Sequence, residues 1–103
     1  MDKIKHLCRV EFDQVMKSKK DLLLFFYKNN DATSILGLNT MQEVFTLIAR
    51  PFDMYLIDVE KEPEIANAFS IEIVPEYISM KENKIYKRST DLLEASGALS
   101  LLK

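Results

Sequence analysis

The apolar positions of this chain follow two different periods, and the period indicates which segments are strands. Leu22 to Tyr27 form an unbroken apolar run, which predicts a strand buried on both faces, as in a sheet covered by helices on either side. A second segment rich in strand-forming residues, Phe52 to Val59, predicts another strand. Two further short strands, 76–80 and 84–88, are separated by only three residues, which requires an antiparallel hairpin.

Helical spacing of apolar residues appears between these strands. A weak strand at 3–7 is followed by the apolar spacing Phe12, Val15 and Met16, which predicts a short helix. The same spacing from Met41 to Ile48 predicts a helix that ends near Arg50, before Pro51. Shorter helices are expected after Pro63 and at the end of the chain, the last on Leu92, Ala95, Leu99 and Leu102.

The start of the Met41–Ile48 helix is expected to be separate from the turn that precedes it. Thr40 and Glu43 have the spacing of a capping box, and Gly37 and Asn39 lie just before them. We therefore expect any helical turn that begins near Asp31 to be kinked or broken before Thr40. The predicted order is βαβαβαββα, an α/β fold with helices on both faces of a mixed sheet.

Composition limits the class of protein. The chain has 103 residues, the size of one domain, and we assign residues 1–103 to it. Its formal net charge of −2 comes from 14 basic and 16 acidic residues mixed along the chain, so we expect neither nucleic acid nor an anionic membrane as a partner. The apolar runs are too short to span a bilayer, and the polar N-terminus does not resemble a signal peptide, so a cytoplasmic address is expected.

The single cysteine, Cys8, excludes an internal disulfide and any metal site built from several cysteines. With one histidine, His6, beside it, no cluster has the spacing of metal ligands. We therefore expect no metal and no cofactor.

Several segments together resemble the thioredoxin family over nearly the whole chain. They are "DKIKHL", "LLLFFY", "LIDVEKEPEIANAFSI" and, most specifically, "IEIVPEYISMKENKIYKR". The resemblance implies the thioredoxin fold, with a sheet of strand order 1-3-2-4-5. It also implies that Pro75, preceded by Val74, is the cis-proline of that family.

The chain departs from the family at the redox site. The Cys-x-x-Cys motif of the family falls on Asp31, Ala32, Thr33 and Ser34, its tryptophan falls on Asn30, and its buried carboxylate falls on Phe25. Disulfide exchange needs one thiolate to attack and a second thiol to resolve the mixed disulfide. The loss of both thiols and of the proton acceptor therefore argues against this activity.

No other residue near the turn is assigned a catalytic role. Asp31 suits the N-cap of a helix better than a base for the hydroxyl of Ser34 or Thr33. The resemblance places His6 on the first strand, remote from the turn, and Cys8 at the start of the first helix. A small apolar or half-buried residue is the preferred interpretation of Cys8. A reactive thiol needs a cationic neighbour, and the nearness of Arg9 and His6 in the sequence leaves that alternative open.

Our first hypothesis is a redox-inactive thioredoxin-like protein that binds a protein or peptide partner in the groove beside the cis-proline loop. The candidate groove residues are Tyr27, Asn29, Asn30, Ile73, Val74 and Pro75, beside the vestigial turn Asp31–Ser34. The alternative is a protein of thiol-disulfide redox homeostasis that acts through Cys8 or a partner's thiol. Assembly through strand 84–88 or helix 41–48 is a third possibility; Lys84, Lys87 and Arg88 oppose strand pairing there, so a monomer or weak dimer is expected.

Overall fold

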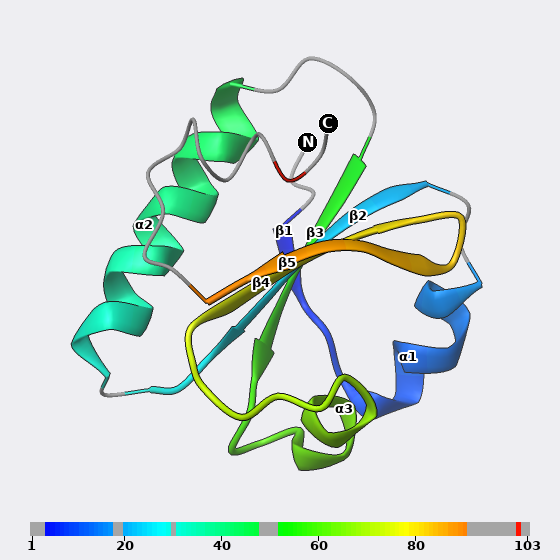
Figure 1. Ribbon diagram of the computed structural model, residues 1–103, viewed down its shortest axis with the longest axis horizontal. Helices are drawn as coiled ribbons and strands as arrows, with labels where there is room; N and C mark the ends of the chain where they lie inside the picture. Colours follow the sequence, from blue (N-terminus) through cyan, green and yellow to red (C-terminus); the bar gives the residue numbers. More distant parts are fainter. Residues whose placement is uncertain (1–3, 18–19, 30, 48–51, 91–100, 102–103) are drawn as a thin grey trace.

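The computed structural model describes residues 4–17, 20–29, 31–47, 52–90 and 101 (Figure 1). Their elements follow one another as β1 (Ile4–His6), α1 (Arg9–Met16), β2 (Asp21–Tyr27), α2 (Ala32–Leu47), β3 (Phe52–Asp58), α3 (Pro63–Ala68), β4 (Glu76–Lys81) and β5 (Lys84–Ser89). The predicted order of strands and helices is therefore confirmed through β5. The closing helix predicted on Leu92 to Leu102 lies outside the described residues.

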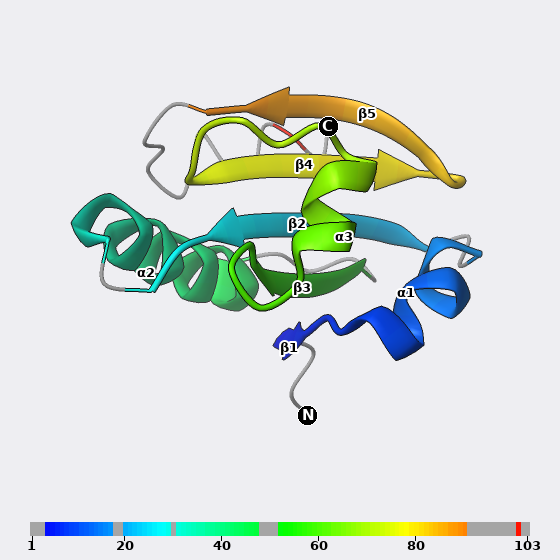
Figure 2. The same cartoon turned by 90° about the horizontal axis from the view of Figure 1, so that it is seen from below.

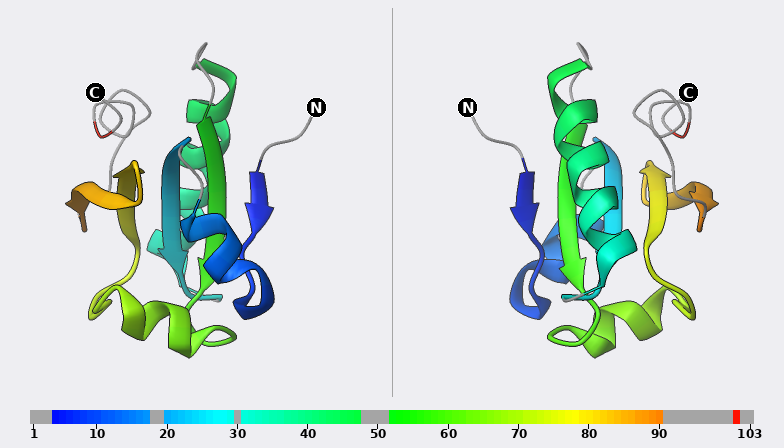
Figure 3. Two further views of the ribbon diagram at one scale, coloured as in Figure 1. Left: turned by 90° about the vertical axis from the view of Figure 1, so that its right-hand side faces the viewer. Right: turned by 90° about the vertical axis from the view of Figure 1, so that its left-hand side faces the viewer.

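The five strands form one mixed sheet of order β1-β3-β2-β4-β5, as the resemblance implied (Figure 2). β1 and β2 both run parallel to β3, whereas β4 is antiparallel to β2 and to β5. β1 and β5 form the two edges of the sheet (Figure 3). Because β1, β2 and β3 are parallel, their carboxyl ends lie at the same end of the sheet. The segments that follow His6, Tyr27 and Asp58 begin there.

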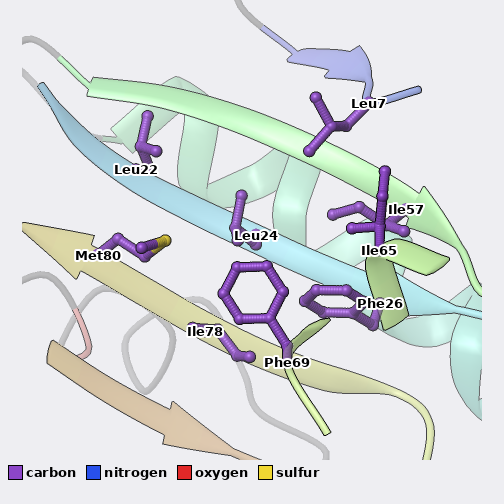
Figure 4. Packing of buried hydrophobic residues seen from close by; sticks show 9 residues of the cluster. All are labelled: Leu7, Leu22, Leu24, Phe26, Ile57, Ile65, Phe69, Ile78 and Met80. Atoms are coloured by element: carbon purple, nitrogen blue, oxygen red, sulfur yellow. The ribbon is translucent and has the colours of Figure 1, made fainter. Parts of the chain in front are cut away.

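Alternate residues of β2 fill the two faces of the sheet, which explains its unbroken apolar sequence. Leu24 and Phe26 lie in a cluster with residues of α3 and the neighbouring strands (Figure 4). The ring centroids of Phe26 and Phe69 are 5.4 Å apart. On the opposite face, Phe25 lies against α2 and pairs through its ring with Tyr77 of β4 at 5.0 Å. Helices therefore cover both faces, as predicted (Figure 1).

The expected break before Thr40 is wrong. α2 is one continuous helix from Ala32 to Leu47, and the Thr40 hydroxyl donates to the carbonyl of Leu36, one turn earlier, at 3.4 Å. Thr40 is therefore inside the helix and does not cap it. Gly37 has a packing role instead, because its missing Cβ leaves room for the ring of Phe25. A glycine inside a helix costs only about 1 kcal/mol relative to alanine, which packing can offset.

Candidate functional site

The turn between β2 and α2 is closed by a short hydrogen-bond network. Oδ2 of Asp31 accepts the amide of Ser34 at 3.1 Å and the hydroxyl of Ser34 at 2.9 Å. Oγ of Ser34 also accepts the amide of Lys28 at 3.2 Å. Asp31 thus caps α2, as expected, and Ser34 is fully buried. The hydroxyl of Ser34 serves the turn and is not presented to a substrate.

A second polar group lies at the carboxyl end of β3. The carboxylate of Asp58 is 5% exposed and accepts the side-chain amide of Asn29 at 3.1 Å and the backbone amide of Glu60 at 2.9 Å. Tyr27 pairs with Asp58 in the parallel register of β2 and β3. Burial, and then the nearby charge of Asp58, raise the pKa of Tyr27. Asp58 thereby joins the segments that follow β2 and β3.

His6, expected to be remote from the turn, contacts the last residue of β2, Tyr27, four residues before Asp31. The hydroxyl of Tyr27 lies 3.5 Å from Nδ1 of His6, and the two rings meet edge to face with centroids 6.2 Å apart. The reason is topological, since both residues end parallel strands and only β3 lies between them.

Cys8 follows the same carboxyl end of β1 and precedes α1. Its thiol is partly buried and donates to a carboxylate oxygen of Glu11 at 3.5 Å. An activated thiol needs a cation beside it, whereas the charged group bonded to Cys8 is an anion. The structure thus favours a structural role for Cys8.

The segment between α3 and β4 carries the cis peptide bond. The bond between Val74 and Pro75 is cis, and Ser70, just after α3, has a left-handed backbone with φ of 55°. Ile73 exposes 62% of its surface, Val74 is partly buried and Pro75 is buried. This cis-proline loop, residues 71–75, therefore presents an apolar side chain outward beside the buried proline.

A pocket of about 260 Å³ lies between this loop and α3. Five of the eight lining residues are aliphatic, and the other three are a cation, an anion and an amide: Lys28, Val59, Pro63, Ala66, Asn67, Ile71, Glu72 and Val74. It is large enough to receive an apolar side chain together with some backbone of a bound segment.

The predicted groove agrees with this pocket only in part. Val74 lines it, but Tyr27 is 5% exposed and packs toward Phe25 and His6, and Pro75 is buried. Asn29 is exposed but is bonded to Asp58. Of the remaining predicted residues, Ile73 is exposed on the loop and Asn30 lies outside the described residues.

Sequence analysis missed the α3 wall of the pocket, which includes Ala66 and Asn67. Among the described residues, no group of three or more histidine, cysteine, aspartate or glutamate side chains could hold a metal. In the same part of the chain, every helix is too short or too polar to cross a membrane.

Comparison with known proteins agrees with this architecture. The chain is 30% identical over 84 residues to a protein named thioredoxin Y2, chloroplastic, from Arabidopsis thaliana, a match that covers 82% of this chain and 50% of that protein. It therefore spans about half the length of this relative. A mutant thioredoxin from Halobacterium salinarum NRC-1 superposes with a TM-score of 0.83 at 15% identity, covering 96% of this chain and 86% of that one. No family model matches the chain.

The strand order, the helices on both faces and the structural match define the thioredoxin fold. The chain therefore has the thioredoxin fold and is similar in sequence to a thioredoxin over most of its length, but it lacks the Cys-x-x-Cys motif.

Proposed function

We propose that this chain is a redox-inactive thioredoxin-like protein that binds an extended segment of a partner protein or peptide beside the cis-proline loop. The observation that carries the proposal is the pocket of about 260 Å³ between α3 and that loop. The pocket, which Lys28 lines, lies next to the turn on which the resemblance places the family's two thiols, at Asp31 and Ser34. Binding at this place needs no sulfur chemistry.

The lining of the pocket combines aliphatic side chains with a cation, an anion and an amide. Val59, Ala66, Ile71 and Val74 supply apolar contacts, and Ile73 extends the apolar surface outward. Extended peptides are commonly held by backbone hydrogen bonds, while pockets take alternate side chains. We therefore expect an extended segment with an aliphatic side chain that enters the pocket.

A phage-displayed library of random heptapeptides, selected on the wild-type protein, supplies the probe for a binding test. The dissociation constant of a selected, fluorescein-labelled peptide is then measured by anisotropy. Val74→Arg places a long cation at the pocket wall and should weaken binding by roughly tenfold or more, since it costs an apolar contact and buries a charge. Ile85→Arg is the matched control, because Ile85 is an exposed residue of β5, 45% accessible, outside the pocket. Equal affinity of the two variants would exclude the pocket as the site.

The alternative, redox activity through Cys8, has a separate test. Insulin reduction coupled to dithiothreitol should be no faster with the protein than without it, because the thiol of Cys8 is bonded to Glu11 and a second cysteine is absent from the chain. Catalysed turnover that Cys8→Ser abolishes would establish the alternative.

A monomer or weak dimer and a cytoplasmic address complete the proposal. Tyr86 on the edge strand lies within cation–π distance of two lysines, with Nζ of Lys81 4.1 Å and Nζ of Lys87 5.2 Å from the ring centre. Charged side chains at an edge oppose pairing with a second chain. Sedimentation at two concentrations should give the mass of one chain at the lower concentration.

A further inference from the structure

Arg88 on the edge strand β5 contacts both ends of the segment that forms one wall of the pocket. Its Nε donates to Oε2 of Glu76 at 2.5 Å, and its Nη2 donates to the backbone carbonyl of Phe69 at 2.9 Å. Phe69 is the C-cap residue directly after α3, and Glu76 is the first residue of β4, directly after the cis-proline. The guanidinium of Arg88 therefore links the residue that precedes the segment containing the cis-proline loop, Phe69, to the residue that follows it, Glu76.

We propose that Arg88 and Glu76 are positioning residues that set the shape of the cis-proline loop, and through it the partner-binding pocket. Three residues of the pocket lining belong to the bridged segment: Ile71, Glu72 and Val74. The effect of Arg88 on partner binding rests on the proposed function. Its effect on the shape of the loop does not depend on that function.

The environment of the pair supports a fixed geometry. The side chain of Glu76 is 5% exposed and that of Arg88 is 37% exposed, so the carboxylate is held mostly out of water. The hydrogen bond to Glu76 raises the pKa of Arg88, while partial burial acts in the opposite direction. Arginine suits this place because its planar group presents several donors in a fixed arrangement, whereas lysine is a single point of charge. Arg88, predicted to oppose pairing at the sheet edge, thus also makes contacts directed toward the cis-proline loop.

The two ends of the loop are tied to the rest of the fold in different ways. At the α3 end, the amide of Ser70 donates to the carbonyl of Asn67 and the amide of Ile71 donates to that of Ala66, at 3.1 and 3.0 Å. At the β4 end, Glu76 is held both by the pairing of β4 with β2, where it lies opposite Phe26, and by the bond of its carboxylate to Arg88. A loop held at both ends presents its pocket wall in one geometry, which lowers the ordering cost of binding.

Amide hydrogen exchange of the intact protein, measured by NMR, tests the inference without any ligand. The reporter is the amide of Ile71, and the amide of Leu24 in the central strand β2 reports global unfolding. In Arg88→Met, exchange at Ile71 should accelerate by roughly tenfold or more beyond any change at Leu24, because two charge-assisted hydrogen bonds are lost. Arg88→Lys should fall between Arg88→Met and the wild type. Lys84→Met, which removes a cation from the same strand, is the matched control and should leave Ile71 unchanged.

The double variant Glu76→Leu/Arg88→Met separates positioning from simple stability. It removes both charges, so global protection at Leu24 should recover relative to Arg88→Met, whereas Ile71 should stay fast. If Arg88→Met does not fold, this double variant and Glu76→Gln take its place. Wild-type exchange at Ile71 in the variants that fold would overturn the inference.

The selected peptide then tests the consequence for binding. Its affinity should fall at least roughly fivefold in the double variant and stay unchanged in Lys84→Met. If the selection yields no peptide that binds the wild type, the proposed function fails. The exchange data then still decide whether Arg88 positions the loop. If the peptide binds the wild type and the double variant equally, the link from Arg88 to binding is refuted.

Discussion

A Cβ atom added to Gly37 would lie 2.4 Å from Cζ and 2.7 Å from Cε1 of Phe25. Phe25 stands where the resemblance places the family's buried carboxylate, so a larger apolar ring occupies that place and the facing helix accommodates it with a glycine. The ring of Phe25 therefore packs against α2 at Gly37, where a larger residue would clash with it.

Gly37→Ala should therefore destabilise the protein, although alanine is the better helix former. Overpacking costs about 1–3 kcal/mol, and the gain in helix propensity returns only about 1 kcal/mol. In a Phe25→Leu background the clash is relieved, and the same substitution should become neutral or stabilising. Urea unfolding of the four proteins of this double-mutant cycle measures the coupling. Additive effects would show that the two sites do not interact.

Local signals predicted the strands and helices, since the apolar run of β2 and the short turn between β4 and β5 each specify their own structure. The strand order and the cis bond before Pro75 were expected only from the family resemblance. Gly37 was misinterpreted because a glycine that ends a helix and a glycine that accommodates a ring from another strand look alike in one dimension. The contact between His6 and Tyr27 was missed for a similar reason, since it crosses β3 and depends on strand order.

The candidate site was less accessible to prediction than the fold. Arg88 and Glu76 are 12 residues apart and become partners only when β4 and β5 pair. Tyr27 was assigned to the groove from its place at a strand end, but strand alternation directs it to the α2 face with Phe25. Such errors arise where the direction of a side chain, and not the position of its backbone, decides the role.

Asp31→Ala should lower the free energy of unfolding by about 0.5–2 kcal/mol, because α2 loses its N-cap. The hydroxyl of Ser34 would also lose its acceptor. Asp31→Asn keeps a side-chain oxygen for the amide of Ser34 and should cost less. Urea denaturation at neutral pH compares the two variants. A wild-type value for Asp31→Ala would contradict the capping role.

Alkaline pH should destabilise the fold partly through Tyr27. Burial and the charge of Asp58 raise its pKa above the ordinary value of 10.0, so the folded state favours the neutral phenol. The unfolded chain therefore releases this proton first as pH rises, and stability that is fully present below about pH 10 is lost as pH climbs toward the folded pKa.

Tyr27→Phe should flatten this part of the stability profile, measured as urea midpoints between about pH 8 and 11. It should also lower stability at neutral pH by about 0.5–1.5 kcal/mol, because the contact between the hydroxyl and His6 is lost. Tyr86→Phe is the control, because Tyr86 is 44% exposed on β5. If Tyr27→Phe and Tyr86→Phe lose stability equally as the pH rises, the alkaline destabilisation comes from groups other than Tyr27.

Restoring the two cysteines should restore a disulfide, because Asp31 and Ser34 occupy the ends of one helical turn at the N-terminus of α2. Residues three apart on a helix face one another, and a helix N-terminus favours the thiolate. Thiol titration of Asp31→Cys/Ser34→Cys after oxidation should show two fewer thiols than after reduction, with Cys8 free in both states. Ser34→Cys alone is the control and should show no such loss.

This double variant should also reduce insulin with dithiothreitol, but slowly. Phe25 is completely buried where the resemblance places the carboxylate that assists proton transfer, so exchange should proceed without that help. Phe25→Leu in the cysteine background is the control for simple loosening of the core and should not raise the rate. Phe25→Asp should raise it, at the cost of several kcal/mol of stability for a buried carboxyl group. Failure of the two cysteines to pair would show that the turn does not match the family's redox site, whatever else the fold shares with it.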